Sequence, residues 1–170
     1  MRRLTALFYR ALMALAALAM VVAFVMVMLG IADRQFAWGL RGLDAYAGYA
    51  IAAALFLALP ETLQRDEHIR VTLLLQRLPA RWRVGLEWWC LAAGLALTAF
   101  LAWYATRLVW VSHATGDVSQ GSDATPLWLP QIALALGCLG LLLGFAEAML
   151  VRAWGGIFFN KGGDEAAHAE

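Results

Sequence analysis

Residues 11–31 read ALMALAALAMVVAFVMVMLGI, an apolar run without a charged side chain. About 20 residues of α-helix cross the hydrocarbon core of a bilayer. Three further apolar runs follow, over residues 43–63, 86–111 and 127–151. Each is continuous and rich in Leu and Ala, whereas barrel strands would alternate apolar and polar residues. The sequence therefore predicts an all-α integral membrane protein with four transmembrane helices.

The overall composition agrees with a membrane protein. Hydrophobic residues make up 63% of the 170 positions and charged residues 15%, with most charges between the runs. We therefore expect a single four-helix membrane domain over residues 1–170, ending in a polar tail at 152–170. The first run is longer than the core of a cleaved signal peptide, so we expect it to be retained. No basic stretch interleaved with aromatic residues points to nucleic acid.

Lys and Arg residues are distributed unevenly around the four runs. Only Arg34 and Arg41 lie in the first connection, and the third connection contains neither residue type. Ten others lie before the first run, in the second connection or after the fourth run: Arg2, Arg3, Arg10, Arg65, Arg70, Arg77, Arg81, Arg83, Arg152 and Lys161. Positively charged loops stay in the cytoplasm. This distribution predicts that both termini and the second connection are cytoplasmic.

The residues that usually bind metals or cofactors are few and scattered. Cys90 and Cys138 lie inside apolar runs without C-x-x-C spacing, so we expect packing residues and no metal site. His68, His113 and His168 lie outside the membrane centre, which disfavours a bis-histidine haem between helices. No triad, carboxylate pair or phosphate-binding loop indicates an enzyme. We therefore expect neither cofactor nor catalysis.

Two ionisable residues lie inside the apolar runs, each near one end. Arg107 is close to the outer end of the third run, and Glu147 precedes Arg152 at the inner end of the fourth. Each is placed to reach the interface or to pair locally. The first two runs have no charge near the membrane centre, which argues against ion-coupled transport by this chain alone.

The fourth run carries a face of small residues. Ala133, Gly137, Gly140, Gly144 and Ala148 recur at spacings of three and four, and Gly140 to Gly144 is a G-x-x-x-G motif. Small residues allow another helix to approach closely. Gly137, Gly140, Gly144 and Ala148 are therefore candidates for contact with a partner protein. Packing against the chain's own helices explains the pattern equally well.

The connection between the second and third runs has an amphipathic pattern over residues 64–83. Its apolar side chains Ile69, Leu73, Leu74 and Leu78 share one helical face, and Arg70, Gln76, Arg77 and Arg81 occupy others. This pattern predicts a segment lying in the cytoplasmic membrane interface, in contact with lipid headgroups, up to Pro79.

Several short motifs occur in a characteristic order. Glu67-His68-Ile69-Arg70-Val71 is followed by Leu78-Pro79, and Pro126-Leu127-Trp128-Leu129-Pro130 opens the run that contains Gly137; Arg34 and Asp44 flank the first connection. With the four-helix topology, this order resembles the small membrane subunit of tripartite ATP-independent periplasmic (TRAP) transporters, the DctQ-like family. The chain departs from that pattern at Asp44, where glutamate is common, and at Pro60, which is placed to kink the second helix.

The resemblance implies a three-part uptake system in the bacterial inner membrane. A periplasmic protein would bind an organic acid, and a large multi-span subunit would move it with sodium ions. The small subunit would be a non-catalytic scaffold for the large one. Its outer loops, residues 32–42 and 112–126, would either touch the binding protein or be flexible and solvated. Two alternatives are a membrane anchor of a redox enzyme and a small stand-alone exporter.

Overall fold

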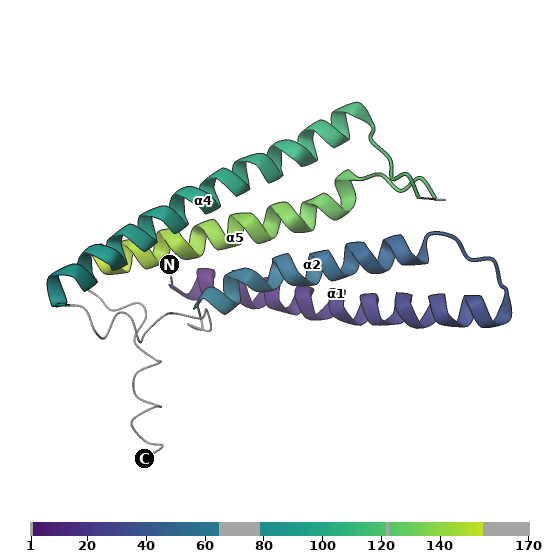
Figure 1. Ribbon diagram of the computed structural model, residues 1–170, viewed down its shortest axis with the longest axis horizontal. Coiled ribbons are helices and arrows are strands. Elements are labelled where there is room, and N and C mark those ends of the chain that lie inside the picture. The colour runs from purple at the N-terminus through teal and green to yellow at the C-terminus, as the bar shows by residue number, and fades with distance from the viewer. Residues whose placement is uncertain (1, 65–78, 122, 155–170) are drawn as a thin grey trace, which may run out of the picture.

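The computed structural model describes residues 2–64, 79–121 and 123–154, and this part of the chain is helical apart from its connections. The helices are α1 (Arg2–Phe36), α2 (Leu43–Gln64), α4 (Ala80–Thr115) and α5 (Trp128–Ala153) (Figure 1). All four are long and apolar enough to cross a membrane. The predicted all-α membrane fold is therefore confirmed. Most of the amphipathic segment, including His68, Ile69 and Val71, lies outside the described residues.

The predicted runs lie almost wholly within these helices, but α1 and α4 are considerably longer than predicted. Hydropathy marks the part of a helix that suits the bilayer core, whereas backbone hydrogen bonding continues beyond it. Pro79 has an extended backbone and precedes the first turn of α4. At the other end, Gly116 adopts a left-handed conformation and donates its N–H to the Ser112 carbonyl. This glycine therefore ends the helix.

The helices pack side by side in the order α1, α2, α5, α4. Helix α1 packs on α2, α2 on α5, and α5 on α4 (Figure 1). We call the end with the starts of α1 and α4 the proximal end, and the end with the loops 37–42 and 116–127 the distal end. Figure 1 shows α2 and α5 diverging toward the distal end. Two helix pairs, α1–α2 and α4–α5, are thus held together mainly by the contact between α2 and α5.

That contact depends on glycines in α5 facing a proline in α2. Pro60 is fully buried, and α2 continues through it to Gln64. Because proline lacks an N–H, the Phe56 carbonyl has no helical donor. A side chain at Gly137 would collide with this carbonyl, and a Cβ at Gly140 would lie 2.7 Å from Pro60 Cγ. The glycines therefore leave the space that the altered turn of α2 occupies.

The other two helix pairs also pack through small residues. The buried residues of α1 and α2 include five alanines, Ala16, Ala23, Ala47, Ala50 and Ala54. A buried cluster between α4 and α5 consists of Ala102, Ala105, Ala135 and Cys138. A Cβ at Gly94 of α4 would collide with the ring of Phe145 in α5. Cys138 is thus a packing residue, whereas Cys90 is exposed and both thiols are free.

We expect Gly137→Ala to lower the free energy of unfolding by about 1–3 kcal/mol, as overpacking does in other cores. The added methyl group would meet the Phe56 backbone, which cannot rotate away as a side chain could. Gly48→Ala is the matched control, because a Cβ at Gly48 in α2 meets no atom within 4 Å. Thermal unfolding in mild detergent, followed by tryptophan fluorescence, compares the two variants. Equal midpoints would contradict this helix contact.

Candidate functional site

The small-residue face of α5 packs inside the chain. Gly137, Gly140, Gly144 and Ala148 are all buried, and Ala148 has no exposed surface. A Cβ at Gly144 would lie 2.9 Å from Leu63 Cδ2 of α2. Gly137 and Gly140 likewise face α2, at Phe56 and Pro60. Of the two interpretations of this face, the structure supports internal packing. The face leaves no room for another protein.

A polar cluster joins three helices at the proximal end. Glu147 Oε2 of α5 accepts a hydrogen bond from Gln64 Nε2 of α2 at 2.8 Å. The same oxygen accepts another from the Tyr9 hydroxyl of α1 at 3.3 Å. Tyr9 is only 1% exposed. Polar groups within a membrane helix pair with groups on other helices, and here they fix α1, α2 and α5 relative to one another.

A second polar contact at this end joins α4 to α5. Arg152 Nη2 lies 3.0 Å from Glu87 Oε2, and both side chains are about one-third exposed or less. Arg152 therefore pairs with Glu87 on a neighbouring helix. The sequence drew attention to Glu147 and Arg152 but missed Tyr9, Gln64 and Glu87. Their only signal in the sequence is a polar group near the same end of each apolar run.

We expect Tyr9 and Glu147 to be energetically coupled. In a double-mutant cycle of Tyr9→Phe and Glu147→Met, the loss in free energy of unfolding of the double variant should be smaller than the sum of the losses of the two single variants. A coupling of about 0.5–2 kcal/mol is usual for hydrogen bonds between membrane helices. Reversible unfolding in mixed detergent micelles measures each free energy. Strict additivity would show that this contact contributes nothing to stability.

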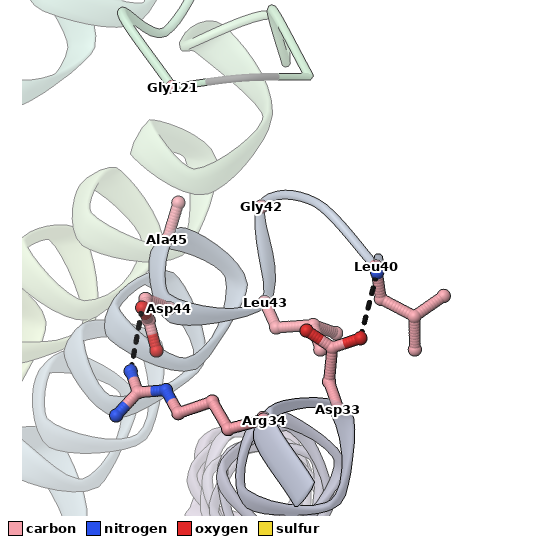
Figure 2. Close-up of a pocket in the computed structure, with 9 residues that line it drawn as sticks. Asp33, Arg34, Leu40, Gly42, Leu43, Asp44, Ala45 and Gly121 are labelled. Carbon is pink, nitrogen blue, oxygen red and sulfur yellow. Dashed lines mark hydrogen bonds and ion pairs between the residues drawn. The ribbon is translucent and has the colours of Figure 1, made fainter. Parts of the chain in front are cut away.

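At the distal end, Arg34 and Asp44 meet across the first loop. Arg34 Nη2 at the end of α1 lies 3.3 Å from Asp44 Oδ2 at the start of α2 (Figure 2). Their side chains are 74% and 87% exposed. Exposed ion pairs contribute little to stability. In the same loop, Asp33 Oδ1 accepts a hydrogen bond from the Leu40 N–H at 2.9 Å, which holds the chain as it reverses.

The described part of the second distal loop is folded on itself. The Ser119 N–H donates to the Thr125 carbonyl at 2.8 Å, and the Leu127 N–H donates to the Asp117 backbone carbonyl at 3.0 Å. Val118 and Pro126 face each other as an isolated bridge. Pro130 follows in the first turn of α5. These hydrogen bonds join the two ends of the loop, and most of its described residues are exposed.

This loop is also attached to the start of α2. The Tyr49 hydroxyl donates to Ser119 Oγ at 2.8 Å. The Thr125 hydroxyl donates to the Asp123 carboxylate and lies 3.1 Å from the Tyr46 hydroxyl. The Asp123 carboxylate is stabilised most by the hydrogen bond from Thr125 and next by one from Tyr46. Both lower the pKa of Asp123 from its ordinary value. The carboxylate is therefore ionised at neutral pH and remains an acceptor.

Gly42 allows the Asp123 carboxylate to lie against the first loop. Its φ is +82°, and a Cβ there would lie 2.8 Å from Asp123 Cγ. We expect Gly42→Ala to detach the second loop from α2, seen as faster hydrogen exchange at the Ser119 and Leu127 amides. Gly39→Ala is the matched control, because Gly39 also has a positive φ, +77°, but has no atom within 4 Å of a Cβ. Equal exchange in the two variants would contradict this role for Gly42.

Two hollows accompany these contacts. One, at the distal end, has a volume of about 280 Å³ and is lined by Asp33, Arg34, Asp44 and Gly121 among others (Figure 2). The other is an apolar groove of about 530 Å³ between α1, α2 and α5, lined by residues such as Leu18, Ala53 and Leu136. Within the described ranges, no three His, Cys, Asp or Glu side chains are placed to hold a metal ion.

Comparison with known proteins identifies one family. Residues 23–156 match the family described as tripartite ATP-independent periplasmic transporters, DctQ component. Comparison with the curated proteins and with the solved structures finds no match. The matched residues include the C-terminal part of α1, from residue 23, and all of α2, α4 and α5. This family is a component of a transporter and not an enzyme.

Proposed function

We propose that this chain, which belongs to the DctQ component family of TRAP transporters, scaffolds the large multi-span subunit of its transporter. That subunit would carry out sodium-coupled uptake of an organic acid delivered by a periplasmic binding protein. The observation that carries this proposal is the set of contacts that joins the helices at both ends and along the glycine face of α5. Such contacts suit a rigid support.

The distribution of charged residues favours the role of a scaffold over the role of an ion carrier. In the described part of the chain, the Asp, Glu and Arg side chains of the spanning helices lie toward the helix ends, with Arg107 about two turns from the end of α4. A protein that moves an ion needs a charged or polar group along its path. Sodium coupling therefore belongs to the large subunit in this proposal. This chain is non-catalytic and binds neither metal nor cofactor.

The proposal places the chain in the bacterial inner membrane with its proximal end in the cytoplasm. The excess of Lys and Arg at this end supports the orientation, because only Arg34 and Arg41 flank the distal loops. Of the amphipathic segment predicted over residues 64–83, Gln64 ends α2 and residues 80–83 open α4 at this same end, and residues 65–78 lie outside the described residues.

The distal end would then face the periplasm and touch the substrate-loaded binding protein. The rings of Phe36 and Trp38 are stacked 5.4 Å apart and are more than half exposed. They follow Arg34 closely in the chain, and the ion pair of Arg34 with Asp44 is exposed as well. Aromatic and Arg side chains are enriched in protein interfaces. These side chains add little to the stability of the fold, so contact with a partner is a better explanation for them.

Affinity purification and transport assays test this proposal together. We expect a large multi-span protein to co-purify in near-equal amount with the tagged chain when it is extracted from native membranes in mild detergent. Liposomes containing both proteins should take up an organic acid when the binding protein and a sodium gradient are supplied, and liposomes lacking this chain should not. A haem-bearing partner, or transport by the chain alone, would overturn the proposal.

A further inference from the structure

Helix α4 has two opposite faces with the same residue spacing. One face packs toward α5 and is buried or half-buried, with residues recurring every three or four positions: Leu91, Leu95, Thr98, Ala102, Ala105, Val109 and Ser112. The residues of the opposite face have the same spacing but are exposed: Trp89, Ala93, Ala96, Phe100, Trp103, Arg107 and Trp110. We call this second set the outer face of α4. All three tryptophans of this face are at least 69% exposed.

The outer face carries polar groups inside the apolar span of α4. The apolar span of α4 runs from Val84 to Thr115. Trp89 and Trp110 lie near its ends, where tryptophan suits the membrane interface. Trp103 and Arg107 lie farther in, about 18 Å and 12 Å from Thr115 along the helix axis. Lipid hydrocarbon offers no hydrogen-bonding partner to an indole N–H or a guanidinium group.

Several charged groups in the spanning helices have partners within this chain. Glu147 accepts hydrogen bonds from Tyr9 and Gln64, and Arg152 pairs with Glu87. Arg10 and Arg107 make no hydrogen bond or ion pair with any described residue, and Arg107 lies farther from the end of its span than Arg10 does. A charge within a transmembrane helix is costly unless it is paired or reaches water. The pattern points to an anionic group outside this chain.

We infer that the outer face of α4 is the docking surface for a transmembrane helix of the large subunit that carries a carboxylate opposite Arg107. This inference rests on the proposed scaffold function and adds the place of contact. Ala93 and Ala96 lie between the aromatic residues, so a second helix can approach α4 closely there. Trp89, Phe100 and Trp103 would then pack around that helix.

The position of Arg107 also argues against a second copy of this chain as the partner. Two copies with the same membrane orientation, paired through this face, would bring their Arg107 side chains to the same depth. Like charges in such a contact repel each other, and the repulsion is strong where water is excluded. A large subunit with a carboxylate at this depth satisfies the guanidinium instead.

Photo-crosslinking locates the docking surface. A p-benzoylphenylalanine replaces Trp103 on the outer face, Phe24 on α1 or Leu18 in the apolar groove, with the large subunit co-expressed in native membranes. Trp103, Phe24 and Leu18 are 69%, 65% and 59% exposed, and each lies within a spanning helix. We expect irradiation to link position 103 to the large subunit, with at least a fivefold lower yield from positions 24 and 18.

The outcomes separate this inference from the proposed function. Crosslinks to the large subunit mainly from position 24 or 18 would overturn the α4 surface while leaving the scaffold function intact. Crosslinks from position 103 to a second copy of this chain would also overturn it. A large subunit that neither co-purifies with the unmodified chain nor crosslinks anywhere would overturn the proposed function itself.

Substitutions of Arg107 test the carboxylate. We expect Arg107→Ala to weaken association with the large subunit at least about thirtyfold, as removal of one member of a buried ion pair does, and Arg107→Lys to retain most of the recovery. Arg41→Ala, at an exposed position in the first distal loop, is the control and should recover the large subunit normally. If Arg107→Ala also recovers it normally but loses bound anionic phospholipid, the guanidinium binds a lipid phosphate and the carboxylate assignment is wrong.

Discussion

The close approach of α5 to α2 determines how the two helix pairs are placed. Inside a bilayer the hydrophobic effect does not drive helices together, so packing and polar contacts decide their arrangement. Pro60 removes one hydrogen-bond donor from α2, and Gly137 provides the space for the carbonyl that is left. This contact brings the end of α5 beside α1 and α2, so that Glu147 reaches both Tyr9 and Gln64. The proximal polar cluster is therefore a consequence of the glycine face.

The two ends of the molecule are held by different means. The proximal end uses side chains that project from the helices themselves, whereas the distal end uses a loop folded against α2. Between them α2 and α5 diverge, which leaves the apolar groove beside α1 (Figure 1). With each helix tied at one or both ends, relative motion of the helix pairs requires breaking several contacts at once. This coupling is the mechanical property that a static support needs.

Hydropathy alone predicts the four helices, because the bilayer imposes one length and one backbone geometry on each span. Composition and charge also identify Glu147, Arg152 and the glycine face as positions to examine. Their partners were not predictable, since Tyr9 and Glu87 lie far from them in the sequence and the helix order in space was unknown. Whether the glycines face a partner or α2 depends on the location of Pro60 across the interface. Arg34 and Asp44 were identified only through the family resemblance, although both flank one short loop.

Helix α4 shows how a membrane subunit can be stable alone and still incomplete. Its backbone hydrogen bonds are internal, and one face packed on α5 fixes its position, so the opposite face is not needed for folding. That face nevertheless has bulky aromatic residues and an arginine in place of the uniform aliphatic side chains that lipid alone requires. A guanidinium without a partner at this depth adds cost and no stability to the isolated chain. This unfavourable free energy is offset only when a neighbouring protein supplies an anion. The outer face of α4 therefore contributes to the stability of the assembled transporter and not to that of the isolated subunit.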